Sequence, residues 1–316
     1  MNGKEASAGL LLSQISPTTG YYHSGYAHAL SEFGTPLELA QSKAYYLKRT
    51  IPGESDADGL GCYPFLFCKN WSALASDLDL LSHELVSFAA LPDPFGAYTM
   101  SDLQRAFPDF VTPFKLHYVA DLSQPYNDIV SKTNRYYARK ALVGIEVEIH
   151  PEPLRFLEQW TVLFGQMVER FQLQGIRAFS RRSFELQLGL PGAYIALARY
   201  RGEPIAAHIH LLCGEVLYAH VAAVSPDANA LGASYALLST AIRYFADKAR
   251  WLNWGGAAGI NSGGQLSDFK RGWSTETRPA YFCGRIFNPE RYHALALAKG
   301  CSASTYFPAY RAGEFV

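Results

Sequence analysis

Residues Trp251 to Trp273 read WLNWGGAAGINSGGQLSDFKRGW, an apolar run followed by a glycine-rich stretch. Glycines at this density favour positive φ angles or a close approach of the backbone to a ligand. The stretch ends in Phe269-Lys270-Arg271-Gly272-Trp273, which holds two cations between aromatic residues and a glycine. The alternative is a surface loop that is merely rich in glycine, but loops this long in compact domains are usually functional or disordered. The pattern predicts a short buried strand at Trp251–Trp254 that leads into a functional loop.

The composition is that of a folded protein with balanced charge. The 316 residues include 28 Lys and Arg and 28 Asp and Glu, and 49% are hydrophobic. The length favours two domains, the apolar content argues against disorder, and the balanced charge gives no sign of a protein that coats nucleic acid. Five cysteines without a CxxC pair favour reduced thiols in a cytoplasmic protein over a disulfide scaffold or structural zinc. No apolar run approaches the roughly 20 residues of a membrane helix.

The first half of the chain predicts strands and helices in alternation. Strand patterns cover 44–50, 61–68 and 113–122, an acidic turn covers 53–61, and 71–88 has helical spacing. His117 lies in the third strand, as either a structural or a functional residue. A helix at 126–142 places Lys132, Arg135 and Arg139 on one face. That face is either an ordinary solvated face or one that meets phosphates.

The second half predicts a meander of strands followed by a helix. A strand at 145–149 and helices at 153–173 and 181–188 precede strands at 194–200, 205–213 and 216–224. Their short connections force antiparallel pairing. A loop then opens a helix with one apolar face, formed by Tyr235, Leu238, Ile242, Phe245 and Ala249. A strand, a loop and the start of a helix form a phosphate-binding layout, because the first amides and the helix dipole favour anions.

This order resembles the GNAT acyltransferase fold, and four pieces of sequence resemble its FemABX-like branch. The pieces are the basic helix 131–141 with the strand after Gly144, Leu231-Gly232-Ala233-Ser234-Tyr235, Leu252-Asn253-Trp254-Gly255-Gly256 and Phe269-Lys270-Arg271-Gly272-Trp273. The resemblance implies an α/β (α+β) protein with two tandem GNAT-like domains, each a mixed, mainly antiparallel sheet flanked by helices. It places the first domain at residues 1–130 and the second, with the donor site, at residues 131–316.

The resemblance also implies the residues of the site. In this family the last meander strand and the following helix hold the pyrophosphate of coenzyme A, which assigns donor binding to Asn229, Gly232, Ala233 and Ser234. Gly232 matches the family's loop pattern, whereas Asn229 and Ser234 depart from it. Substrate binding is expected at His117, Arg135, Arg139, Trp254, Gly255, Gly256 and Phe269.

Acylation of an amine sets the chemistry that the site must perform. The amine must lose a proton, the developing oxyanion must be stabilised and the reactants must be aligned. Lys270 is the candidate for the oxyanion, with a phosphate or carboxylate contact as its alternative role. His208, His220 and Tyr218 are the candidate bases; the register of their strands, which decides whether they share a face, is not fixed by the sequence. Although three histidines lie close in sequence, no further ligand points to a metal, and none is expected.

The sequence therefore predicts an N-acyltransferase that moves an acyl or aminoacyl group from an activated donor, with acyl-CoA favoured, to an amine. The expected acceptor is a small molecule or a peptide or glycan precursor. One alternative is a transferase that uses aminoacyl-tRNA, to which cations at Arg135, Arg139, Arg177, Arg181 and Arg182 would lend support. Another is a catalytically inactive GNAT-like binding protein, which the altered loop at Asn229 and Ser234 favours.

Overall fold

A computed structural model describes residues 19–256 and 264–314. Within this part of the chain one continuous sheet of eleven strands forms the centre, with β3–β4 and β9–β10 as its parallel pairs and antiparallel pairing elsewhere. In spatial order the strands are β1 (Thr35–Glu38), β2 (Tyr45–Thr50), β3 (Ala57–Gly61), β4 (Ser87–Ala90), β11 (Glu276–Ile286), β5 (Phe110–Asp121), β10 (Trp251–Gly256), β9 (Val216–Val224), β8 (Glu203–Cys213), β7 (Ala193–Tyr200) and β6 (Ile145–His150). The predicted mixed, mainly antiparallel α/β architecture is confirmed.

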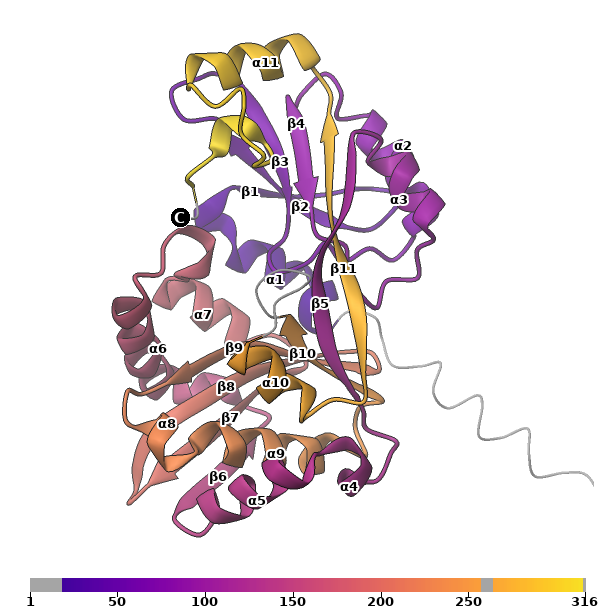
Figure 1. Cartoon of the computed structure of the whole chain (residues 1–316). Helices are drawn as coiled ribbons and strands as arrows, with labels where there is room; N and C mark the ends of the chain where they lie inside the picture. Colours follow the sequence, from indigo (N-terminus) through magenta and orange to yellow (C-terminus); the bar gives the residue numbers. More distant parts are fainter. Residues whose placement is uncertain (1–18, 257–263, 315–316) are drawn as a thin grey trace, which may run out of the picture.

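Helices cover the two ends of this sheet separately, and the long strands β5 and β11 connect the ends (Figure 1). Around the β6–β10 end lie α4 (Tyr126–Ile129), α5 (Lys132–Ala141), α6 (Leu157–Phe171), α7 (Arg181–Leu188), α8 (Ala228–Leu231), α9 (Ala233–Phe245) and α10 (Gln265–Arg271). Around the β1–β4 end lie α2 (Leu74–Asp79), α3 (Met100–Ala106) and α11 (Pro289–Ala298), and α1 (Ser24–Ala29) packs between the ends against α7. No helix of the described ranges is long and apolar enough to cross a membrane.

Alternation along the meander separates two hydrophobic cores. Ile195 and Leu197 of β7 face the aromatic side chains of α6 and α7, whereas the intervening Ala196 and Ala198 face α9. Small side chains on the second face let α9 lie close to the sheet. The predicted meander and the predicted apolar face of the following helix are both confirmed, because short turns and local periodicity dictate them.

The elements before β5 differ from the sequence prediction. The expected strand at 61–68 is irregular, since Pro64 has no N–H for a ladder, and the strand is β3, Ala57–Gly61, within the segment expected to be an acidic turn. Asp58 is fully buried there because Arg49 and Arg311 bind its carboxylate. The helical spacing at 71–88 also fails, because α2 ends at Asp79 and the buried β4 begins at Ser87.

The chain returns from the second half to the first. β11 pairs with β4 and β5, and Tyr292 and Leu295 of α11 pack in one cluster with Ile51 and Val86. Residues beyond 276 therefore complete the core of the β1–β4 end. The division at residues 130 and 131, and a shared fold of the two ranges, stay predictions.

Candidate functional site

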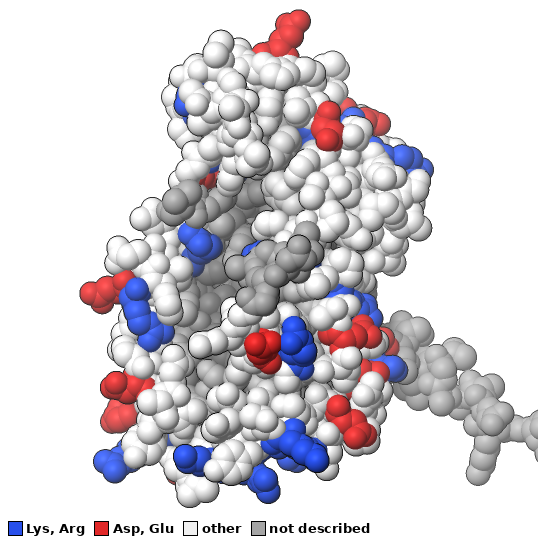
Figure 2. Space-filling view, in the orientation of Figure 1, with Lys and Arg blue, Asp and Glu red and all other residues white. Residues whose placement is uncertain are grey.

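A cavity of about 890 Å³ opens where β9 and β10 diverge. The two strands pair in parallel from Trp251 opposite Val216 to Asn253 opposite Tyr218, and then separate. Beyond this point Ala219, His220, Val221 and Ala222 of β9 line the cavity. On the side where β10 has left it, the edge of β9 presents unpaired backbone donors and acceptors to a ligand. The fold thus places a partly polar strand edge inside a large hollow between its two ends, and Figure 2 shows Lys and Arg atoms within this hollow.

Two lysines converge on the glycine pair that ends β10. Lys270, from α10, donates from Nζ to the Gly256 carbonyl oxygen at 2.7 Å. Lys115, from β5, lies across Gly256, where an added Cβ would meet the Lys115 Cβ at 3.1 Å and its Cδ at 3.2 Å. Gly255 has a φ of +75°, a conformation that L side chains rarely adopt. Both glycines are therefore needed for the backbone to pass beneath the two lysine side chains.

The cavity is electropositive. Its basic lining residues are Arg49, Lys115, Arg177 and Lys270, and no described lining residue is an Asp or Glu. Arg49 is paired with Asp58 and Glu314. Burial, and then the charge of Lys115, lower the pKa of Lys270 to about 8, while burial and the charge of Arg177 lower the pKa of Lys115. Cations in this setting favour an anionic ligand or an anionic transition state.

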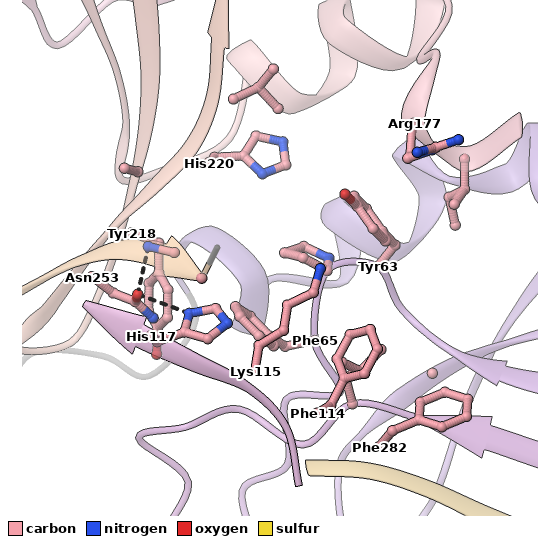
Figure 3. Close-up of a pocket in the computed structure, with 18 of the residues that line it drawn as sticks. Tyr63, Phe65, Phe114, Lys115, His117, Arg177, Tyr218, His220, Asn253 and Phe282 are labelled. Atoms are coloured by element: carbon pink, nitrogen blue, oxygen red, sulfur yellow. Dashed lines mark hydrogen bonds between the residues drawn. The ribbon is translucent and has the colours of Figure 1, made fainter. Parts of the chain in front are cut away.

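His117 of β5 is held in one tautomer beside the lysines. The Gly255 N–H donates to Asn253 Oδ1 at 2.9 Å, so this oxygen is an acceptor, and His117 Nδ1 at 3.1 Å from it must donate. His117 Nε2 is left with its lone pair, on the ring edge that Figure 3 shows turned away from Asn253. Burial is the main cause that lowers the pKa of His117 to about 4, so the ring is neutral near pH 7.

The three predicted bases lie on two faces of the sheet. His208 lines the cavity on the side of α9, with its ring 5.9 Å from that of His210. Tyr218 and His220 share the opposite face, where both rings contact Tyr21. The pairing of β8 and β9 shifts so that His220 is an additional, bulged residue, which the sequence does not reveal. The described residues contain no group of three metal-ligating side chains.

Hydrogen bonds already occupy the polar atoms of Tyr218 and His220. Tyr218 donates to Asp93 Oδ1 at 2.7 Å. His220 Nδ1 lies 2.7 Å from the Tyr21 hydroxyl, and its Nε2 lies 2.8 Å from Gln187 Oε1. Burial raises the pKa of Asp93 to about 7 and lowers the pKa of His220 to about 3. These two candidate bases are thus engaged in the core, whereas His208 has no such partner among the described residues.

Some of the remaining predicted residues line the cavity and the others do not. Trp254, Gly255, Gly256, Phe269 and, at the first turn of α9, Ser234 line the cavity. The other members of the predicted donor and substrate sets, Asn229, Gly232, Ala233, Arg135 and Arg139, are not among the lining residues. On α5, Arg139 is exposed and Arg135 is half-buried. Their assigned roles stay predictions, since a ligand that extends beyond the cavity can reach them.

The sequence-based site lacked two residues that the structure adds. Lys115 is two residues before His117 in one strand, so alternation alone places both on one face. Asn253 belongs to the Leu252–Gly256 motif, but its contact with His117 depends on the pairing of β10 with β5. The sequence alone therefore shows that Lys115 lies on the same face of its strand as His117. It does not show that Asn253 is the hydrogen-bond partner of His117.

Comparisons with known proteins agree with the fold. Residues 129–271 match the model of the acetyltransferase (GNAT) domain. The structure of FemX has a TM-score of 0.63 and 14% identity, covering 86% of this chain and 93% of its own. L-PGS from Bacillus licheniformis has a TM-score of 0.63 and 14% identity, with 89% and 91% covered. The C-terminal domain of a putative lysylphosphatidylglycerol synthetase from Agrobacterium fabrum has a TM-score of 0.61 and 13% identity, with 89% and 92% covered. At these identities the likeness concerns the fold; no curated protein matches the sequence significantly.

Proposed function

We propose that this chain, which carries a GNAT-type acetyltransferase domain, is an N-acyltransferase that moves an acyl or aminoacyl group from an activated donor to an amine. One observation carries the proposal: the Lys270 ammonium is fixed on Gly256 in an electropositive cavity where β9 and β10 diverge. A preorganised cation in a water-poor site stabilises charge that develops in the transition state more than charge in the ground state.

The transfer is a nucleophilic substitution at the donor carbonyl. The nitrogen lone pair of the acceptor attacks the carbonyl carbon, and the C=O electrons move onto oxygen, next to Lys270. When the tetrahedral intermediate collapses, the C–S bond of a thioester breaks, or the C–O bond of an ester. The leaving thiolate or alkoxide takes up one proton, and the amine nitrogen gives up one proton as the amide forms.

His117 is the group best placed to accept the proton of the amine. Its Nδ1–H is fixed by Asn253, so Nε2 is the acceptor, and it lies on the strand that also presents Lys115. His208 also lines the cavity, and burial followed by the charge of Lys270 lowers its pKa to about 4, so it is neutral at pH 7 as well. His117 is preferred because an oriented ring needs no further ordering.

Acyl-CoA is the preferred donor. The first turn of α9 reaches the cavity through Ser234, and no side chain caps this helix start, where the helix dipole favours an anion. The unpaired edge of β9 suits a donor arm that carries amides. The alternative donor is aminoacyl-tRNA. This alternative is favoured by the similar fold of the putative lysylphosphatidylglycerol synthetase domain, whose name indicates an aminoacylated lipid. The altered Asn229–Ser234 loop favours an inactive binding protein, whereas the Lys270–Gly256 arrangement argues against it.

The test is to incubate the purified chain with an acyl-CoA pool or a charged tRNA pool, together with an amine pool, and to identify products by mass spectrometry. The expected result is an amide product that needs one donor pool and forms roughly a hundredfold more slowly in Lys270→Ala. The exposed Lys69→Ala is the matched control and should retain activity. Saturable donor binding without any amide product would support the inactive binding protein instead.

A further inference from the structure

The cavity holds a second ammonium group that the transfer reaction leaves unexplained. Lys115 lies against Gly256, whose carbonyl oxygen accepts from Lys270, so one cation reaches this end of the cavity from the strand β5 and the other from the helix α10. No carboxylate in the described part of the chain forms an ion pair with Lys115. A partly buried cation without an ion-pair partner is costly unless a ligand supplies the anion.

An irregularity in β5 builds the position of Lys115. The pairing with β11 shifts between Ala280, which faces Lys115, and Tyr281, which faces Pro113, so Phe114 is an additional residue on β5. A bulge re-aims the side chains around it. As a result Phe114 and Lys115, which are neighbours in sequence, both line the cavity, and the Lys115 Nζ lies 4.7 Å from the centre of the Phe114 ring.

An apolar surface begins directly beside this cation. The rings of Phe114 and Phe282 lie 5.8 Å apart, Phe282 and Phe307 lie 6.3 Å apart, and Phe110 and Phe307 stack at 6.0 Å. These four side chains form an aromatic wall that leads away from Gly256, and Figure 3 shows its Phe114 and Phe282 beyond Lys115. Gly284 makes the wall possible, because a Cβ there would come within 2.5 Å of the Phe307 ring.

We propose that the acceptor is an amine that carries an anionic group close to its nitrogen and a bulky apolar body, with Lys115 binding the anion and the aromatic wall binding the apolar body. The proposal rests on the acyltransferase function above. It follows from adjacency: the reacting end at Lys270 and His117, the anion site at Lys115 and the apolar wall succeed one another along one cavity. Hydrophobic amino acids and aminophospholipids share this chemistry.

Equilibrium binding to the intact chain, measured by isothermal titration calorimetry without donor, tests the inference in two arms. The first arm compares L-phenylalanine with 2-phenylethylamine, which lacks only the carboxylate. The second compares dihexanoyl phosphatidylethanolamine with dihexanoylglycerol, which lacks the charged headgroup. In at least one pair, we expect the compound that carries the negatively charged group, called the anionic member below, to bind about tenfold more tightly or better. The reason is that hydrogen bonds to charged groups are the stronger ones. The arm that shows the difference identifies the source.

Two variants and a control assign the effect to the named residues. Lys115→Met keeps the stem that packs on Gly256 and should abolish the preference for the anionic member. Phe114→Ser, at a side chain that is 39% exposed, should weaken both members of a pair several-fold without unfolding the chain. The exposed Lys69→Met should change neither. A preference that persists in Lys115→Met, equal binding within both pairs, or no saturable binding of either anionic probe would overturn the inference.

The binding measurement needs no turnover, so its failure can be told apart from a failure of the proposed acyltransferase function. If amide products form while neither anionic probe binds, the transferase stands and this acceptor class is wrong. If an anionic probe binds through Lys115 while no donor is consumed, the site stands as a ligand site and the transferase is wrong.

Discussion

Replacing Lys270 tests whether the chain catalyses acyl transfer by stabilising an oxyanion. Its ammonium is fixed 2.7 Å from the Gly256 carbonyl, so an oxyanion that takes up a neighbouring position lies within about 3 Å of one positive charge. At an effective dielectric constant of about 20, such a pair interacts by about 5 kcal/mol. Water that enters the variant restores part of this energy. The loss expected for Lys270→Ala is therefore about 3 kcal/mol, roughly a hundredfold in kcat or more.

The assay is steady-state kinetics on the donor and acceptor found by mass spectrometry, with Lys69→Ala as the control. KM for the acceptor should change little, because the interaction strengthens only in the transition state. Burial and Lys115 lower the pKa of Lys270 to about 8, so the ammonium is present below pH 8 and lost above it. The turnover of the wild-type chain should thus fall as the pH rises through about 8.

Lys270→Arg sharpens the prediction. A guanidinium stays charged at every accessible pH, so the decline near pH 8 should vanish, while a planar fork in place of a point charge should restore only part of the rate. A raised KM with unchanged kcat in Lys270→Ala would make Lys270 a binding residue and refute the mechanism. Unchanged kcat and KM together would mean that the Phe269–Trp273 signature is only structural.

Three further changes test other parts of the structure. His117→Gln should lower kcat by about a hundredfold or more, the scale of general-base catalysis, whereas the same change at the exposed His83 should have no effect; equal kinetics would leave His208 as the base. Ser234→Trp should weaken acyl-CoA binding tenfold or more in a titration without unfolding the chain, since Ser234 lines the cavity; a substitution at Gly232 would be less clean because of its φ of +77° and the Ala141 side chain beside it. Asp58→Ala should lower the free energy of unfolding in urea by about 3–5 kcal/mol, because the buried Arg49 and Arg311 lose the buried carboxylate that they share and keep only the half-buried Glu314; a loss below 1 kcal/mol would contradict this.

Local patterns predicted the half of the fold that short-range rules control. The β7–β9 meander follows from short turns, α9 from its apolar spacing, and β10 from a compact apolar run before Gly255. β3 was missed because the burial of Asp58 depends on Arg311, which comes from the far end of the chain. Such long-range neutralisation of a charge leaves no local signal, so an acidic segment looks like a turn.

The same distinction holds for the site. Lys270 and the Gly255-Gly256 pair were found from sequence because one contiguous stretch carries them. The partnership of His117 with Asn253, and the contact of Lys115 with Gly256, depend on the register in which β5 pairs with β10. The different faces of His208 and His220 depend in addition on a bulge in β9. Pattern gives the direction of a side chain along its own strand, but only pairing gives its neighbours.

The two lysines suggest how a weakly basic histidine could serve as the base in the proposed reaction. With a pKa of about 4, His117 is a poor base for an ordinary amine. Lys115 and Lys270 share one buried end of the cavity, and the charge of Lys115 already lowers the pKa of Lys270. A protonated acceptor amine placed between them faces the same repulsion, so its own pKa must fall as well. An anionic group on the acceptor that pairs with Lys115 holds the substrate in place and offsets the charge of Lys115, so the charge of Lys270 is the one that lowers the pKa of the amine and later stabilises the oxyanion. The cavity thereby promotes loss of the amine proton through fixed positive charge, and His117 has only to receive it.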